Sequence, residues 1–329
     1  MDRDNSVTKV PSGYIQLATA GRGSAGVVFY CLPRSSVRSL HAPETTLLPP
    51  KHSVAKELRT QLVAVKIGHS KLFKEVTSRE VNVLQRLKGF NAYGKEGGRF
   101  AQLLDYEIVD DSLGHCSWLA VEAIYPSIQL EMLLYGHGRS FPREFTAHLF
   151  LQLGEALRFL HKELQVTHGD FQYNNLLVDL SSRHASGFFN LVVHDFSMSR
   201  ELTVDEEVAI NNHDYQLPYS DMFAFYSKTF DIMDDGWLKV NPVGDNIERA
   251  ILFGSTLTCN DINEIWKRYE SAARALRDTR EEHVVESVER VALKALAESG
   301  RDCITDEMLL GALSNNGIDA KNNLNETEE

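Results

Sequence analysis

The sequence predicts an α+β fold, in which a small strand-rich N-terminal lobe precedes a mainly helical C-terminal lobe. Short β-branched and aromatic runs, separated by turn residues, recur through the first 124 positions. Beyond them, apolar residues recur mostly at helical spacing. The length of 329 residues, with 43% hydrophobic and 24% charged residues, suits a two-lobed globular protein. We place the lobes at 1–123 and 124–315.

The first part of the N-terminal lobe contains three predicted segments. Residues 14–31, Y-I-Q-L-A-T-A-G-R-G-S-A-G-V-V-F-Y-C, predict a strand, a glycine-rich turn and a second strand. Residues 32–60 hold four prolines and little periodicity, which predicts a long exposed loop. The run L-V-A-V-K-I at 62–67 predicts a short strand.

A helix and two strands complete this lobe. Apolar residues at helical spacing predict a helix over 71–88, which Gly89 would end. Two further strands are expected near 100–108 and 117–124. The lobe is therefore expected to hold five strands and one helix.

The C-terminal lobe is expected to begin with a long helix over 142–164, because Pro142 suits a first helical turn. A strand pair follows at 176–179 and 188–193, around a turn rich in Ser and Gly. Helical character resumes at about 219 and continues to near 314. The polar residues 316–329 predict a disordered tail.

Composition excludes several classes of partner. The net charge of −12 argues against nucleic-acid binding, which rests on basic surface. No run approaches the roughly 18 apolar residues of a membrane span, and the N-terminus lacks the apolar core of a signal peptide. The four cysteines show no metal-type pairing. We therefore expect an intracellular protein, cytoplasmic or nuclear, that works without a membrane.

The first chemical motif is a run of three glycines. Gly21, Gly23 and Gly26, with Val28 after them, would let a hairpin bring backbone N–H groups close to phosphate oxygens. The motif is weak alone, because a glycine hairpin without a ligand has the same pattern. A dinucleotide-binding turn would need a helix after Gly26, and V-V-F-Y-C predicts a strand instead.

The second and third motifs are a strand-end lysine and a helical glutamate. Lys66 ends the apolar run V-A-V, and Glu80 lies one helical turn before Leu84. A Lys66–Glu80 pair would fix the ammonium group for contact with phosphate. A lysine that reaches water and a solvated glutamate remain the alternatives, and Glu75 is a rival partner.

The fourth motif is the loop H-G-D-F-Q-Y-N-N at 168–175, together with Asp195 after the next strand pair. Asn175 and Asp195 carry hard oxygen ligands that suit Mg²⁺ bound to phosphates. Asp170 is then available to accept a proton from an attacking hydroxyl.

The four motifs, in this order, resemble the protein-kinase superfamily over about 13–230. The resemblance implies a two-lobed protein-kinase-like fold and the transfer of the ATP γ-phosphate to a hydroxyl. By it, Lys66, paired with Glu80, holds the α and β phosphates of ATP, Asp170 is the catalytic base, and Asn175 and Asp195 bind Mg²⁺. The adenine would be held by Val28, Ala64 and Leu177 and by the backbone of the hinge residues Glu122 and Ile124. Tyr219–Phe225, with Asp221, is similar to the start of the family's central C-lobe helix.

Three departures keep the acceptor open. Gly169 stands where most protein kinases have an arginine, Gln172 where many have a lysine, and Ser197 where most have a glycine. A protein is the first candidate acceptor, because the hinge and Asp221 patterns are closest to protein kinases. The loop H-G-D with Gln172 is also similar to the aminoglycoside and choline kinases, which favours a small hydroxyl-bearing substrate as the alternative. An ATP-binding pseudokinase that acts as an interaction module is the third interpretation.

Overall fold

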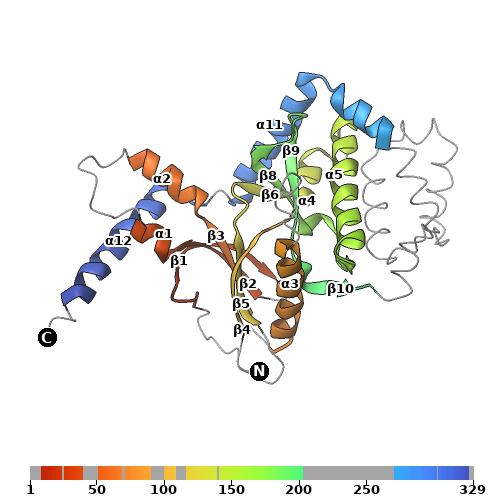
Figure 1. Ribbon diagram of the computed structural model, residues 1–329. Coiled ribbons are helices and arrows are strands. Elements are labelled where there is room, and N and C mark those ends of the chain that lie inside the picture. Colours follow the sequence, from red (N-terminus) through yellow and green to blue (C-terminus); the bar gives the residue numbers. More distant parts are fainter. Residues whose placement is uncertain are drawn as a thin grey trace, which may run out of the picture. The chain divides into compact units, whose positions relative to one another are not determined.

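The computed structural model describes residues 9–23, 26–39, 51–68, 71–89, 100–108, 116–138, 141–202, 270–301 and 303–325, with the side chains of 71–75 and 316–325 excepted. The fold is α+β, with an N-terminal antiparallel sheet followed by helices (Figure 1). The chain divides into two compact units. The first contains Met1–Val81, Gln102–Tyr125 and Arg301–Glu329, and the second contains Asn82–Ala101 and Pro126–Gly300.

A five-stranded sheet is the framework of the first unit. Its spatial order is β1-β2-β3-β5-β4, and every neighbouring pair is antiparallel. The strands are β1 (Tyr14–Gly23), β2 (Gly26–Pro33), β3 (Val63–Gly68), β4 (Leu103–Ile108) and β5 (Cys116–Glu122). All five strands lie where the alternating and β-branched runs predicted them, within a few residues at their ends.

Helix α3 (Lys71–Gly89) follows β3, as the apolar spacing predicted. Its buried positions, from Thr77 to Leu87, recur every three or four residues along one face. The side chain of Ser78 accepts a hydrogen bond from the backbone N–H of Cys116 at 2.9 Å, which ties the helix to the start of β5.

The long exposed loop expected over 32–60 is wrong in its described parts. Residues Arg34–Ser39 form α1 and residues Lys51–Thr60 form α2. Ala55 and Leu58 of α2 are fully buried. The prolines dominated the sequence pattern, but Pro50 directly precedes the first residue of α2, where it does not interrupt a helix.

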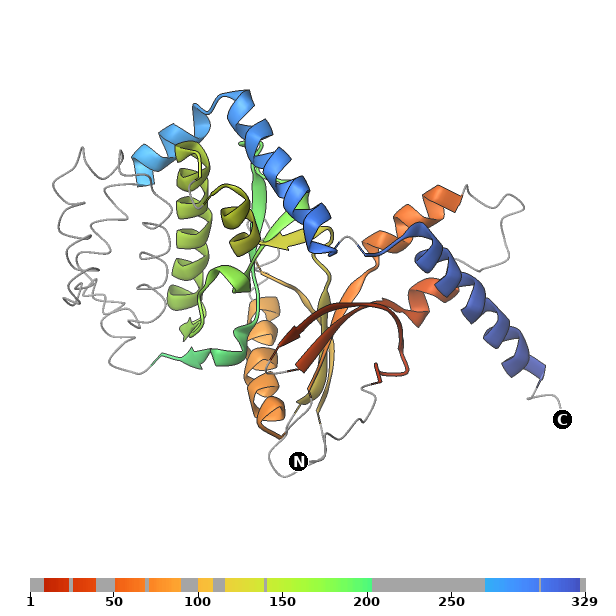
Figure 2. The same ribbon diagram turned by 180° about the vertical axis from the view of Figure 1, so that it is seen from behind.

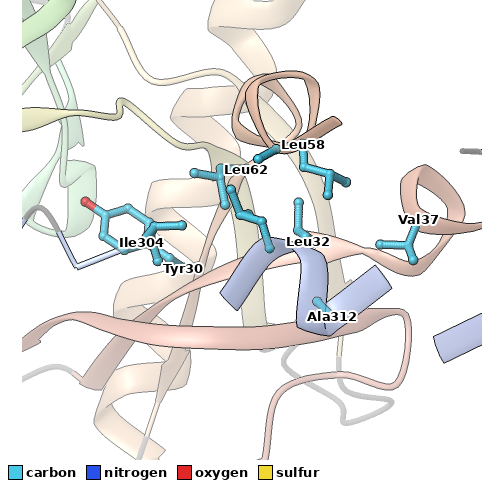
Figure 3. Packing of buried hydrophobic residues seen from close by; sticks show 9 residues of the cluster. Tyr30, Leu32, Val37, Leu58, Leu62, Ile304 and Ala312 are labelled. Atoms are coloured by element: carbon cyan, nitrogen blue, oxygen red, sulfur yellow. The ribbon is translucent and has the colours of Figure 1, made fainter. Parts of the chain in front are cut away.

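The C-terminal residues also depart from expectation. Helix α12 (Asp306–Asn325) covers most of the segment expected to be a disordered tail over 316–329. Residues 301–315 were expected in the C-terminal lobe, but they belong to the first unit. Figures 1 and 2 show α12 beside α1 and α2. The physical reason is one shared core, shown in Figure 3, whose main members are Tyr30, Leu32, Val37, Leu58, Leu62, Ile304, Leu309 and Ala312.

The second unit combines helices with two small sheets (Figure 1). Its helices include α4 (Leu130–Gly136), α5 (Arg143–Lys162) and α11 (Glu282–Ser299). The larger sheet has the order β6-β8-β9, and the smaller one pairs β10 with β7. These strands are β6 (Ser127–Gln129), β7 (Val166–Thr167), β8 (Leu176–Arg183), β9 (Phe189–Val193) and β10 (Arg200–Glu201). The predicted helix over 142–164 and the strand pair after it are therefore present.

Two further expectations are only partly covered. The helical stretch from 219 to 314 lies outside the described residues as far as 269, and 270–278 are helical before α11. In the described part of the chain, no helix is both long and apolar enough to cross a bilayer.

Candidate functional site

The glycine motif forms the end of the β1–β2 hairpin. Gly21 lies opposite Val28, and Gly23 lies opposite Gly26. Strand β2 follows Gly26, so the chain does not have the helix that a dinucleotide-binding turn needs at this point. Among the atoms of the described residues, a Cβ built on Gly21 or Gly23 would meet none within 4 Å. The described part of the chain therefore does not crowd these two glycines.

Lys66 and Glu80 form a buried ion pair within the first unit. The Nζ atom of Lys66 lies 2.7 Å from Oε2 of Glu80, and the side chains are 11% and 6% exposed. The pairing predicted from the sequence is therefore confirmed. Neither alternative applies, because the lysine does not reach water and the glutamate is not solvated. The side chain of the rival, Glu75, lies outside the described residues.

One face of the sheet carries the residues expected around adenine together with Lys66. Val28 of β2 lies directly opposite Lys66 of β3, so the two side chains point to the same face. Ala64 is two residues before Lys66 and shares that face as well. Both Val28 and Ala64 are half-buried. Val63, Val65 and Ile67 of β3 alternate with these residues, so their side chains point to the opposite face of the sheet. There they belong to a separate hydrophobic cluster.

The expected hinge residues, Glu122 and Ile124, lie at and just beyond the end of β5. The backbone N–H of Glu122 donates to Gln102 O at 2.8 Å, and that of Ala123 donates to Leu62 O at 3.2 Å. These bonds fix the course of the chain where it leaves the sheet. The backbone N–H groups of Glu122 and Ala123 therefore hold this segment to the neighbouring chain.

In the second unit, the loop 168–175 forms a closed polar network around Asp170. Gln172 Nε2 donates to Asp170 Oδ1 at 2.6 Å, and Asn175 Nδ2 donates to Asp170 Oδ2 at 2.8 Å. The same Asn175 nitrogen also bonds the Asp170 backbone carbonyl at 2.8 Å. Within the described part of the chain, the carboxylate of Asp170 is thus held by two neutral amides, which orient it without neutralising its charge.

His168 anchors this loop to the strand pair after it. Its Nε2 lies 3.1 Å from the carbonyl of His194, and its Nδ1 lies 3.3 Å from the backbone N–H of Asp170. A carbonyl only accepts and a backbone N–H only donates, so the ring is neutral with its proton on Nε2. Its ring packs 5.0 Å from that of Phe196, which is fully buried. His168 is thus a structural anchor of the loop.

Asn175 and Asp195 lie at the same end of the β8–β9 hairpin. Leu176 pairs with Val193, and His194 donates its backbone N–H to Asn175 O at 3.1 Å. Asp195 adopts φ 62° and ψ 74°, a left-handed conformation that is unusual for a residue with a side chain. Such strain costs about 1–3 kcal/mol and is concentrated at functional sites.

This pair fits the magnesium ion that the sequence implies. Both hydrogen bonds of the Asn175 amide nitrogen point to Asp170, which leaves its amide oxygen to bind a cation. The described residues contain no group of three or more His, Cys, Asp or Glu side chains that could hold a metal by themselves. Magnesium suits such a site, because it is bound by one or two carboxylates with phosphate oxygens and water.

Gly169 has a steric role that sequence reasoning did not find. Its φ is +77°, and a Cβ at this position would lie 2.1 Å from the carbonyl oxygen of Met198. Ser199 Oγ donates to the carbonyl of His168 at 3.1 Å, and β10 pairs with β7 just beside it. The segment after Asp195 is thus packed directly on the loop 168–175. These contacts join residues far apart in sequence, so they cannot be predicted from the local sequence pattern.

The predicted site residues fall into two groups. Lys66, Glu80, the glycine hairpin, Val28, Ala64, Glu122 and Ile124 belong to the first unit, and Asp170, Asn175, Leu177 and Asp195 belong to the second. In the first group Lys66 bonds Glu80, and in the second group Asn175 bonds Asp170. Tyr219–Phe225, with Asp221, lies outside the described residues. No protein-family model matches the chain, and no match was found among curated proteins.

Proposed function

We propose that this chain is an ATP- and Mg²⁺-dependent phosphotransferase of the protein-kinase superfamily, with a two-lobed protein-kinase-like fold. The observation that carries the proposal is the buried Lys66–Glu80 ion pair, with its Nζ–Oε2 distance of 2.7 Å. A buried ion pair adds little net stability, because desolvation of the two ions offsets their attraction. A fixed cation next to the glycine hairpin has a clear use in holding phosphate oxygens.

Each polar residue has a role in this proposal. ATP would supply the phosphoryl group, and Asn175 and Asp195 would hold Mg²⁺, which would supply positive charge near the phosphates. Lys66 donates to the phosphate oxygens, and Glu80 holds the lysine ammonium in place. Asp170 accepts the proton of the attacking hydroxyl, whose oxygen bonds to the γ-phosphorus as the bond to ADP breaks. Gln172 and Asn175 fix the direction in which the Asp170 carboxylate faces.

A protein is the first candidate for the acceptor, and a small hydroxyl-bearing molecule is the second. The second is favoured by the Gln172–Asp170 hydrogen bond of 2.6 Å. An amide that is engaged with the base adds no positive charge, so a lysine-like contact with the transferred phosphate is missing from this position. Gly169 also favours the small-molecule acceptor, because its conformation and the nearby Met198 carbonyl leave no room for the arginine that most protein kinases have there.

Phosphate transfer from labelled ATP tests the proposal. The purified chain is incubated with Mg²⁺–ATP and with panels of peptides and of small alcohols. We expect transfer to members of one panel, and its loss in Asp170→Asn and in Lys66→Ala. Glu286→Gln, which neutralises an exposed carboxylate on α11, is the matched control and should keep full activity.

A binding measurement separates the enzyme from an interaction module. Saturating Mg²⁺–ATP should raise the melting temperature of the wild-type chain, because a ligand that binds only the folded state stabilises it. A shift without transfer to either panel would favour the pseudokinase. The absence of any shift would contradict all three interpretations.

A further inference from the structure

The C-terminal segment 303–312 packs on the same sheet face as the residues proposed for adenine. Tyr30 of β2 lies opposite Ala64 of β3, so both side chains point to this face. Tyr30 belongs to the hydrophobic cluster that also contains Ile304, Leu309 and Ala312 (Figure 3). The segment therefore covers the part of the face that adjoins Ala64.

Both backbone groups of Ile304 are held by side chains of the first unit. Its N–H donates to the hydroxyl of Tyr125 at 3.0 Å, and its carbonyl accepts from Arg59 Nη2 at 3.1 Å. Ile304 itself is 2% exposed, whereas the side chain of Arg59 is 32% exposed. Arg59 Nη1 also lies 2.7 Å from Asp306 Oδ1, at the start of α12. The segment is thus fixed by directional bonds in addition to apolar packing.

Tyr125 connects this segment to the proposed hinge. It directly follows Ile124, and its ring packs edge-on against Tyr30, with centroids 5.3 Å apart. Ala123, between the hinge residues Glu122 and Ile124, also packs against the same cluster. The hinge backbone is therefore supported by the sheet at Glu122 and Ala123 and by the C-terminal segment at Tyr125.

We propose that the C-terminal segment is an intramolecular clamp that positions the hinge 122–125 for nucleotide binding. Tyr125 is the positioning residue, since it bonds the clamp and adjoins the backbone that would contact adenine. The nucleotide part of this inference rests on the proposed function, whereas the clamping of the hinge does not. Any event that releases residues 303–312 would lower nucleotide affinity without touching a group that binds phosphate.

The variant Tyr125→Phe tests the clamp, because it keeps the ring and removes only the hydroxyl that Ile304 bonds. Tyr14→Phe is a matched control, since it removes a hydroxyl bond of 3.2 Å to Asp105 within the same unit. Amide hydrogen exchange of Glu122, Ala123 and Ile304 reports the clamp itself. Titration calorimetry with Mg²⁺–ATP reports nucleotide affinity.

In Tyr125→Phe we expect exchange at these three amides to rise by about threefold to tenfold, the range for loss of one hydrogen bond. The dissociation constant for Mg²⁺–ATP should rise by a similar factor, with the turnover number at saturating ATP unchanged. Tyr14→Phe should leave the exchange of all three amides unchanged.

The two readouts separate the failure of this inference from the failure of the proposed function. Unchanged exchange in Tyr125→Phe would overturn the clamp, whatever ATP does. Faster exchange with unchanged ATP affinity would overturn its role in nucleotide binding. If the wild-type chain does not bind Mg²⁺–ATP, the proposed function fails together with that role, and exchange still decides whether the clamp exists.

Discussion

At the scale of single residues, Gly169 is tightly constrained by its neighbours. Its positive φ excludes most side chains, and the Met198 carbonyl lies where a Cβ would be. A 2.1 Å contact with backbone cannot be relieved by turning a side chain. The glycine therefore lets the segment after Asp195 pack directly on the proposed catalytic loop.

We expect Gly169→Ala to destabilise the protein by about 3 kcal/mol or more, because positive-φ strain adds to the clash. Gly138→Ala is the control, since Gly138 also has a positive φ but has no atom of the described residues within 4 Å of its Cβ position. It should cost only about 1 kcal/mol, the backbone share of the effect. Chemical denaturation measures both variants. Equal losses of stability would show that the Met198 contact yields easily.

The Lys66–Glu80 pair gives a second prediction at this scale. Lys66→Met removes the cation that bonds the buried carboxylate of Glu80, and Glu80→Leu removes the carboxylate that bonds the ammonium group of Lys66. Each single change should cost about 3–5 kcal/mol, whereas the double change should cost far less, because no charge remains buried. Denaturation of the three variants checks this thermodynamic cycle. Additive losses would mean that the two residues do not depend on each other for stability.

Phosphate transfer should be lost in all three of these variants, including the double variant that regains stability. That pattern would show that the Lys66–Glu80 pair is needed for phosphate transfer and not for stability. A double variant with full activity would remove the observation on which the proposed function rests.

The residue-scale contacts within one motif could be predicted from the sequence. Asp170 and Asn175 share a short loop, and Lys66 and Glu80 lie on consecutive elements, so local geometry limits where their side chains can be. The contacts of Gly169 with Met198 and of His168 with Ser199 could not be predicted. They depend on how the chain returns after the β8–β9 hairpin, which local pattern does not determine.

At the scale of elements, strands β1–β5, β8 and β9 and helices α3 and α5 could be predicted, but α2 and the part of α12 beyond residue 314 could not. Among the side chains that the structure describes, each helix buries only a narrow apolar face, against the other helix and the sheet. For α2 that face includes Ala55 and Leu58, which are too few to stand out among polar neighbours and nearby prolines. When two helices are buried mainly against each other, neither segment needs a strong apolar periodicity of its own.

The bond between Arg59 of α2 and Asp306 of α12 makes the contact of these helices depend on pH. The hydrogen bond from Arg59, with His52 adding to it, lowers the pKa of the Asp306 carboxyl below its ordinary value. A lowered folded-state pKa means that this contribution is present above the unfolded pKa of about 4 and is lost as pH falls further. Exchange of the Ile304 amide should therefore accelerate below about pH 4, after correction for the intrinsic rate.

Asp306→Asn should remove this acid-dependent acceleration, because an amide does not titrate in this range. Glu307→Gln is the matched control, since Glu307 is also exposed in the first turn of α12 and makes no ion pair with Arg59 in the described part of the chain. It should keep the acceleration. If Asp306→Asn shows the same acceleration in acid, a titratable group other than Asp306 causes it.

At the scale of the whole molecule, the first unit combines an N-terminal segment, up to Val81, with a C-terminal segment that begins at Arg301. Arg59 and Ile304 are 245 positions apart in sequence and share a hydrogen bond. Contacts of such long separation form slowly, because the intervening chain must be ordered first. The sheet is therefore expected to gain its full stability only after residues 303–312 have been added.

Truncation tests this dependence directly. A chain that ends at Gly300 loses the partners of Leu32, Leu58 and Leu62, so its sheet should open more often. Cys31 of β2 reports the opening, because burial raises the pKa of its thiol to about 12. In the intact protein, alkylation of Cys31 at pH 8 should be much slower than in the unfolded chain, because the thiol is fully buried and burial also raises its pKa. The chain that ends at Gly300 should lose most of this protection, whereas a chain that ends at Asn315 keeps the buried residues of α12 and should retain it. Equal protection in both truncated chains would show that the sheet folds without its C-terminal partner.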